Sequence, residues 1–472
     1  MGDRFDADML LSVKEAAIMN LINAQTGDML FVVTVLGSAI MGFFLFKKIF
    51  LGNSLKLTRL TLPSFFIIVY IILMSFPSII WFYSLTGPIR YTYFLAVQSA
   101  LISFPLGVFL ANVLLLGSSS RPSGIVKNFL YSRLLKTRHD SYIFPFWILM
   151  ILLSIVFAIF YILTSSYVPL IGAFTVYGKV PGNIVRHSIF HEGVFIHYTH
   201  ALVARFLLPF CLLHSYFMAY IYKGRWKYLF WITLLLTMFF FLLTFDRSYP
   251  FSIFLFFILA IYFKNKNNQL ISTTRFSSTS KIHGLSIIKM RRAISILVIF
   301  ALAMVFGGII SRAQFNLSFL NLTPILGDSI GFFINRVLLD ASFMARVYFN
   351  VFDNPSTFLY GKSFHVLISS LFGLEFHPTI SPSFVAELWL NFGWAGVLVG
   401  TTIIGFILQF IQLSLFRKKS IPILSLYIIL LLNGAWIIYG HLLATMVVSV
   451  YLLGILFLVF LKKRRVIRPI VN

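Results

Sequence analysis

Long apolar runs recur along almost the whole chain, and they constrain its fold more than any other feature. A helix needs about 20 apolar residues to cross the roughly 30 Å hydrocarbon core of a bilayer. Hydrocarbon offers no partner for backbone polar groups, so each run of that length is expected to be helical. Hydrophobic residues make up 59% of the chain and charged residues only 11%, which excludes an ordinary soluble domain. We therefore predict an all-α, polytopic integral membrane protein.

About eleven of these runs are predicted to cross the membrane, and together they form a single transmembrane domain over residues 1–472. Charged residues break the runs and set the approximate boundaries of the spans. The predicted spans are 29–46, 62–86, 92–116, 143–163, 199–222, 226–245, 249–263, 293–311, 384–413, 421–439 and 442–461.

Basic residues are concentrated in alternate connections between these spans. About 27 of the 38 Lys and Arg residues lie in segments 47–59, 121–138, 223–227, 264–292, 417–419 and 462–468, which the positive-inside rule places in the cytoplasm. An odd number of spans then puts the N-terminus outside and the C-terminus in the cytoplasm. Two sizeable outward segments remain, a first extracytoplasmic loop at 164–198 and a long, late, partly helical loop at 312–383.

Several functions are disfavoured by composition and spacing. The net charge of +25 follows the topology instead of gathering on one soluble face, so no nucleic acid partner is predicted. A single cysteine, Cys211, excludes an intramolecular disulfide. His187, His191 and Glu192 suggest zinc, but Phe195 stands where the HExxH motif needs its second histidine. We therefore predict neither a metal site nor a cofactor.

Basic residues outside the cytoplasmic segments are mostly arginines, and this bias indicates a phosphate ligand. A guanidinium group binds phosphate oxygens in a bidentate manner and keeps its charge, whereas lysine acts as a point charge. An unpaired charge within a span would cost about 2.5–3.5 kcal/mol, so an arginine there must face a polar cavity or a partner. The predicted pyrophosphate ligands are Arg205, Arg247, Arg312, Arg336 and Arg346, supported by Asp246, Asp340 and Arg186.

Structural roles for several of these residues stay open. Asp246 can cap a tight turn while Arg247 extends to lipid headgroups. Asp328, Arg336 and Asp340 have the spacing of an amphipathic surface helix as well as that of a shared binding face. Arg205 can belong to a structural ion pair.

Three short motifs resemble those of Wzy-type polymerases of O-antigen and capsule repeat units. The stretch PSFVAELWLNFGWAG at 382–396 resembles the last loop-to-helix junction of that family, with a Glu followed by Asn-Phe-Gly. GKSF at 361–364 resembles the glycine-led segment before this junction, and TFDRS at 244–248 resembles an arginine-bearing turn between middle spans. The glycines of the junction, Gly393, Gly396 and Gly400, are expected to permit close helix packing rather than to touch substrate.

This resemblance implies an enzyme of the bacterial inner membrane whose active site faces the periplasm. Its partners would be an undecaprenyl-pyrophosphate-linked oligosaccharide and membrane lipid, with a chain-length regulator and a flippase as candidate protein partners. The growing glycan moves to the terminal sugar of a new repeat, the lipid pyrophosphate leaves, and no nucleotide sugar is required. A carboxylate or histidine must accept the proton of the acceptor hydroxyl. The candidates are Glu387, then His365 and His377, although a carboxylate at a helix start also favours the macrodipole without catalysis.

Two other functions remain as alternatives. An O-antigen ligase would use the same architecture to hand finished glycan to lipid A-core, with an outer-loop histidine in the main role. A lipid-linked oligosaccharide flippase, or another secondary transporter, would instead line a path near the bilayer midplane with its charges. The predicted site residues gather at the outer edge of the bundle, which favours the enzyme.

Replacing Arg247 by lysine tests the proposed phosphate contact. Arg247→Lys keeps the charge and removes the bidentate geometry, so we expect glycan transfer to fall well below the wild-type rate. The rate is measured in membranes of a strain that lacks the native gene, with Arg133→Lys in a predicted cytoplasmic segment as the control. Full activity of Arg247→Lys would reduce Arg247 to a membrane anchor.

Overall fold

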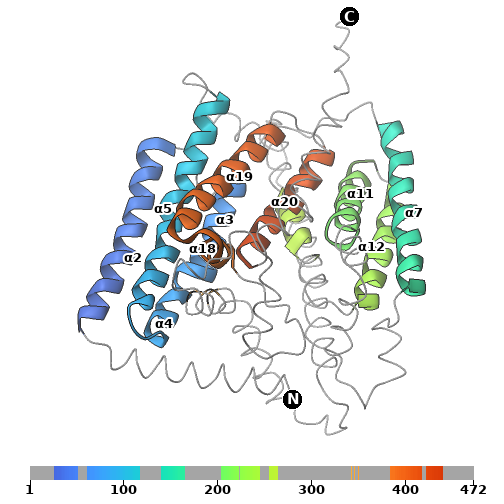
Figure 1. Cartoon of the computed structure of the whole chain (residues 1–472). Helices are drawn as coiled ribbons and strands as arrows, with labels where there is room; N and C mark the ends of the chain where they lie inside the picture. Colours follow the sequence, from blue (N-terminus) through green and yellow to red (C-terminus); the bar gives the residue numbers. More distant parts are fainter. Residues whose placement is uncertain are drawn as a thin grey trace, which may run out of the picture. The chain divides into compact units, whose positions relative to one another are not determined.

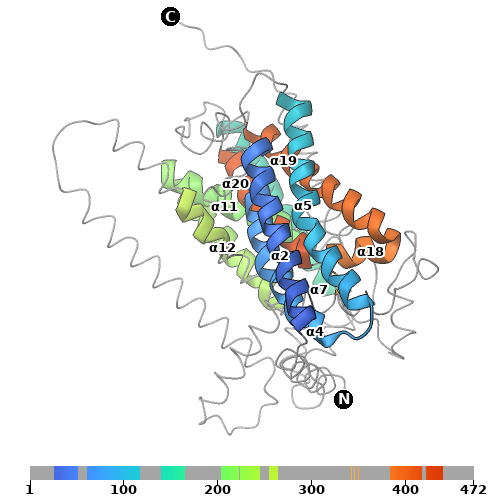
Figure 2. The same ribbon diagram turned by 90° about the vertical axis from the view of Figure 1, so that its left-hand side faces the viewer.

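The structure is a computed structural model of the 472-residue chain, and all the regular secondary structure that it describes is helical (Figures 1 and 2). It describes residues 26–51, 61–116, 140–164, 203–222, 224–244, 253, 255–263, 342, 345, 349, 383–416 and 421–439. Four helical stretches in these residues are long and apolar enough to cross a membrane: Thr26–Phe46, Leu62–Ser84, Ile89–Leu115 and Phe384–Phe416. The prediction of a helical membrane protein is confirmed, whereas the count of eleven spans and their orientation stay predictions.

The helices follow the predicted spans closely. Labelled as in Figure 1, they are α2 (Thr26–Phe46), α3 (Leu62–Tyr70), α4 (Pro77–Ser84), α5 (Ile89–Leu116), α7 (Asp140–Thr164), α11 (Leu208–Tyr222), α12 (Arg225–Thr244), α18 (Phe384–Ala395), α19 (Thr401–Phe416) and α20 (Ile421–Tyr439). π-Helical segments adjoin them: η1 (Lys47–Leu51), η2 (Ile71–Ser75), η3 (Val203–Leu207) and η6 (Gly396–Gly400). Residues 253 and 255–263 are also helical, and the predicted spans 293–311 and 442–461 lie outside the described residues.

Two compact units make up the chain. Unit 1 comprises Met1–Val126, Gly331–Ser414 and Asn433–Met446, and unit 2 comprises Lys127–Ile330, Leu415–Leu432 and Val447–Asn472. Helices α2 to α5, α18 and almost all of α19 belong to unit 1, whereas α7, α11 and α12 belong to unit 2. Unit 1 therefore joins the beginning of the chain to a segment some three hundred residues later.

Helices α5 and α19 cross in unit 1 with their backbones in direct contact. A Cβ atom added to Gly107 of α5 would lie 1.8 Å from the carbonyl oxygen of Thr402, and one added to Gly405 of α19 would lie 2.2 Å from that of Phe104. Neither position can carry any side chain, because the two backbones touch there. Lipid supplies no hydrophobic force between helices, so such small-residue contacts are a main source of their packing energy.

Hydrogen bonds between side chains reinforce this crossing along its length. The Thr402 hydroxyl donates to the Ser103 carbonyl at 3.1 Å, and the Gln409 amide nitrogen donates to Asn112 Oδ1 at 2.6 Å. One turn further on, Gln412 Oε1 accepts the backbone N–H of Leu62 at 2.7 Å. That N–H is in the first turn of α3, where no intrahelical acceptor exists. The polar residues of α19 thus tie it to both α5 and α3.

Gln98 of α5 stabilises the irregular passage from α3 to α4. Pro77 begins α4 and has no N–H to donate, and the preceding turn is the π-helical segment η2. The Gln98 amide donates to the Ser75 carbonyl at 3.2 Å and to the Ser78 hydroxyl at 3.0 Å, while its oxygen accepts from the Ser75 hydroxyl at 2.7 Å. All these groups are buried. The Gln98 side chain therefore provides hydrogen-bond partners where Pro77 and the π-helical turn interrupt the regular backbone pattern.

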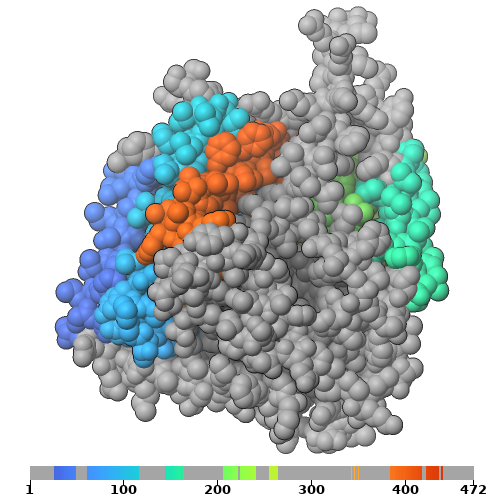
Figure 3. All heavy atoms as spheres, in the orientation of Figure 1, coloured from blue at the N-terminus to red at the C-terminus, as the bar shows by residue number. Residues whose placement is uncertain are grey.

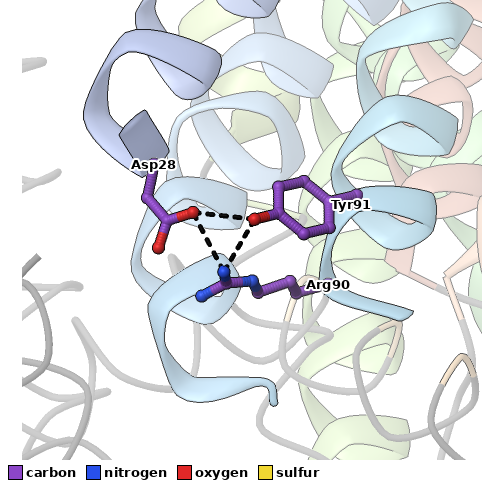
Figure 4. Close-up of polar contacts among 3 residues, drawn as sticks. All are labelled: Asp28, Arg90 and Tyr91. Carbon is purple, nitrogen blue, oxygen red and sulfur yellow. Dashed lines mark hydrogen bonds and ion pairs between the residues drawn. The ribbon is translucent and has the colours of Figure 1, made fainter. Parts of the chain in front are cut away.

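An ion pair attaches α2 to the start of α5 (Figure 4). The Arg90 guanidinium donates to Asp28 Oδ1 at 2.9 Å and to the Tyr91 hydroxyl at 2.7 Å, and that hydroxyl donates to Asp28 at 2.8 Å. Arg90 also lies over the rings of Phe82 and Tyr91. The outer side of α2 is exposed along Leu30, Val33 and Met41, and Figure 3 shows this helix at the surface. An apolar face of this kind suits lipid.

Unit 2 packs α7, α11 and α12 through aromatic residues. Phe157 of α7 stacks on Phe240 of α12 in a buried cluster that includes Val203 and Leu208. His214 of α11 lies between Trp147 and Trp226, with ring centroids 4.8 and 5.7 Å away. Within the described part of the chain neither ring nitrogen of His214 has a hydrogen-bond partner. The imidazole therefore packs as an aromatic ring, edge against face.

Substitution of Gly405 tests whether the α5–α19 contact holds unit 1 together. Gly405→Ala places a methyl group against the Phe104 backbone, so we expect the free energy of unfolding to fall by about 1–3 kcal/mol. Gly37→Ala is the matched control, because a Cβ there meets nothing within 4 Å. Alanine is the better helix former, so that variant should gain up to about 1 kcal/mol. Thermal unfolding in detergent measures both, and equal stabilities would contradict the prediction.

Candidate functional site

Glu387 is the one predicted catalytic residue that the structure describes, and it lies in the first turn of α18. Ser383 caps this helix, its hydroxyl accepting the N–H of Ala386 at 3.3 Å. Only 8% of Glu387 is exposed, and Val385 and Ala386 beside it are fully buried. A carboxylate in the first turn is stabilised by the helix macrodipole, typically by about 0.3–1 kcal/mol. Glu387 is thus a buried acid whose charged form the helix favours.

Gly393 ends the helix that carries Glu387, and this corrects the predicted continuous span 384–413. Its φ of 58° and ψ of −140° are not helical and belong to a region that is essentially restricted to glycine. A Cβ on Gly396 would lie 2.2 Å from the Leu388 carbonyl, and one on Gly400 would lie 2.4 Å from the Leu388 side chain. Residues eight apart in one straight helix are about 12 Å apart, so the chain has folded back.

The fold-back places α18 beside η6 as a helical hairpin, and Figure 2 shows α18 meeting the end of α19 at a sharp angle. The expectation that Gly396 and Gly400 permit close helix packing is confirmed. Both glycines pack against Leu388 of α18, the helix that precedes them in the chain. The spacing of the glycines had not indicated this partner. Among the described residues, the helix that continues toward Phe416 therefore begins only after Gly393.

The start of α18 lies deep in unit 1. Phe384 contacts the rings of Phe66 and Tyr70 of α3, both with centroids 5.6 Å away. Phe66 in turn stacks on Phe104 at 4.6 Å, and Phe104 lies near the middle of α5. Glu387 was expected at the outer edge of the bundle, and its position relative to the membrane stays a prediction. Within unit 1, the start of α18 packs against α3.

Three described residues of the predicted outer loop are buried in unit 1, and one of them contacts α18. Ser342, Ala345 and Phe349 are helical and fully buried. The ring of Phe349 stacks on Trp389 at 4.6 Å with an interplanar angle of 19°, and Trp389 follows Glu387 by two residues. Trp394, beyond the break, meets Trp389 edge-on at 5.6 Å and is 40% exposed. The loop that holds most of the predicted arginines therefore touches the helix that holds Glu387.

Ser342 is held in place by two aromatic donors. The Trp81 indole N–H of α4 donates to the Ser342 hydroxyl at 2.9 Å, and the Tyr93 hydroxyl of α5 donates to the Ser342 carbonyl at 3.1 Å. Tyr93 also contacts Phe349 at 5.4 Å. Sequence reasoning missed Trp81, Tyr93 and Ser342, since aromatic residues within apolar runs read as ordinary core. The partners are 261 and 249 positions apart, and no local pattern links them.

Chemically, this arrangement offers a buried carboxylate on a helix whose neighbouring residues Phe384 and Trp389 contact aromatic rings. Asn391 donates its side-chain N–H to the Glu387 carbonyl at 2.8 Å, which fixes the turn that ends at Gly393. A carboxylate that is shielded from water interacts more strongly with nearby charges and hydrogen-bond donors. No group of three or more His, Cys, Asp or Glu that could hold a metal occurs among the described residues.

Most of the other predicted site residues fall outside the part of the chain that the structure describes. Arg205 lies in the π-helical segment η3 of unit 2, and its side chain is not among those described. The remaining predictions are untested: His365, His377, Arg247, Arg312, Arg336, Arg346, Asp246, Asp340 and Arg186.

The conformation of Gly393 predicts a strict requirement for glycine. Gly393→Ala should lower the free energy of unfolding by about 1–3 kcal/mol, because an L side chain is strained at this φ and ψ. Gly393→Asn should lower the free energy of unfolding by a similar amount, because asparagine tolerates only the neighbouring left-handed helical region. Gly27→Ala, at an open helical position, serves as the control. Thermal unfolding of the three purified variants checks this, and a stable Gly393→Ala protein would mean that α18 continues into α19.

No protein-family model, no curated protein and no solved structure matches this chain. These comparisons therefore assign neither a family nor a function. The likeness of residues 382–396 to the polymerase junction stays an expectation from the sequence, and the geometry around Glu387 is what a proposal of function can build on.

Proposed function

We propose that this protein polymerises lipid-linked oligosaccharide repeat units, as a Wzy-type polymerase of O-antigen or capsular polysaccharide does. The burial of Glu387 at the start of the broken helix α18 carries the proposal. It places a carboxylate, shielded from water, at the junction whose sequence resembles that family. Phe349, a residue of the predicted outer loop to which three of the candidate arginines belong, stacks on Trp389 of the same helix.

In the proposed reaction, Glu387 accepts the proton of the acceptor sugar's hydroxyl. That oxygen then bonds to the anomeric carbon of the growing glycan, and the bond from this carbon to the lipid pyrophosphate breaks. The electron pair leaves on the pyrophosphate oxygen, where arginines stabilise the developing charge. Arg247, Arg312, Arg336 and Arg346 fill this role in the proposal, with Arg205 as a deeper support. The reaction needs no metal or nucleotide, and it would take place at the periplasmic face of a bacterial inner membrane.

One observation favours a second function, the transport of lipid-linked oligosaccharide. Discontinuous helices that end inside the membrane are typical of secondary transporters, and α18 and α19 form such a broken pair around Gly393. The buried Glu387 could bind a coupling proton instead of activating a hydroxyl. The polymerase is preferred because Phe349, a residue of the predicted outer loop, stacks on Trp389 of the helix that carries Glu387.

The substitution Glu387→Gln distinguishes the polymerase from the transporter. In a strain that lacks the native gene, this variant should yield single repeats on electrophoresis of surface glycan, because the amide cannot accept the proton. Glu375→Gln, a neutralised carboxylate elsewhere in the outer loop, is the matched control and should restore long chains. A transporter with a broken cycle would leave no repeats at the surface, so loss of all surface glycan would contradict the polymerase.

An O-antigen ligase is tested in the same strain. It would use an outer-loop histidine, so loss of activity in His365→Ala or His377→Ala with an active Glu387→Ala would support the ligase. Long chains that remain on the carrier lipid and never reach lipid A-core would point the same way. The polymerase predicts the reverse order, with Glu387→Ala inactive and at least one histidine variant active.

A further inference from the structure

A small set of buried contacts attaches the outer loop to unit 1, and we call these residues the Ser342 clamp: Trp81, Tyr93, Ser342, Phe349 and Trp389. Two hydrogen bonds, of 2.9 and 3.1 Å, end on Ser342 from different helices. Both donors and the acceptor are fully buried. Breaking such a bond leaves a buried polar group without its partner, which makes the attachment specific as well as stable.

The clamp continues through stacked rings to the helix of Glu387. Tyr93 contacts Phe349 at 5.4 Å, and Phe349 stacks on Trp389 at 4.6 Å. Trp389 is two residues beyond Glu387, within the helical part of α18 that ends at Gly393. A displacement of Ser342 would therefore be passed to α18 through rings that have no free space around them.

The clamp therefore acts on the helix of the candidate base. Trp389 lies two residues after Glu387 in α18, so the ring contacts of Phe349 and Trp389 hold the helical turn that carries the carboxylate.

We propose that Trp81 and Tyr93 are positioning residues for glycan transfer: by holding Ser342 and Phe349 they set the position of α18, which carries Glu387. This inference rests on the proposed function. Neither residue touches the reacting groups in this role, and both act through Ser342 and Phe349. A misplacement of about 1 Å can cost a reaction on the order of 100-fold in rate, so hydrogen bonds remote from the chemistry can matter this much.

The first experiment measures the clamp itself, without reference to activity. Ala345→Cys is introduced into a Cys211→Ala background, so that the only thiol reports on the buried face of the clamp. Labelling by a maleimide should be slow, and Trp81→Phe together with Tyr93→Phe should raise the rate at least tenfold. Ser99→Ala is the matched control, because it removes a hydroxyl whose hydrogen bond stays within α5. Equal labelling rates in all three proteins would overturn the clamp.

The second experiment is a double-mutant cycle on glycan transfer. Trp81→Phe and Ser342→Ala remove the two ends of one hydrogen bond, so the double variant should lose no more activity than the worse single variant. Loss should appear in kcat, about tenfold or more, with KM for the acceptor nearly unchanged. Ser342→Thr keeps the hydroxyl and should restore most of the rate. Additive losses, or losses that follow thermal stability alone, would overturn the positioning role.

The two experiments also separate this inference from the proposed function. A wild-type protein that transfers no glycan would overturn the proposed function, and with it the positioning role, while thiol labelling would still report the clamp. A wild-type protein that transfers glycan, combined with an additive cycle, would overturn only the inference about Trp81 and Tyr93.

Discussion

Unit 1 depends on the direct contact of two helix backbones, at Gly107 of α5 and Gly405 of α19. Inside a bilayer, apolar side chains gain little by leaving lipid for one another, so close approach and buried hydrogen bonds must supply the specificity. The bonds from Thr402 and Gln409 to α5 can form only because the two glycines allow that approach. The hairpin of α18 and η6 adjoins α19, the helix that these contacts hold against α5.

A second consequence concerns the burial of the candidate site. The helix that carries Glu387 ends at Gly393 and packs against α3, and only 8% of Glu387 is exposed. The helix start supplies a positive end for the carboxylate. A charged group in such surroundings is stabilised by fixed dipoles, which do not have to reorganise during proton transfer.

Sequence reasoning succeeded where one physical rule decides the outcome. Apolar runs of sufficient length must be helical in lipid, and α2, α5, α7, α12 and α20 lie where those runs are. Sequence reasoning did not predict the helix break at Gly393, because the hydropathy is continuous from 384 to 413 and a positive φ does not change the composition. It also missed Ser342 and Trp81, whose bond joins residues 261 positions apart. The predicted role of Glu387 stays a prediction, although its helix-start position is confirmed.

The bond between Leu62 and Gln412 joins two residues separated by 350 positions, and this has a consequence for biosynthesis. The ribosome completes α3 long before Gln412 exists, so the first N–H of that helix enters the membrane without its acceptor. Gln98 is synthesised soon after η2, whereas the acceptor for the first N–H of α3 is synthesised only near the end of the chain. A nascent chain truncated before α19 would leave the first N–H of α3 without the acceptor that it has in the complete protein.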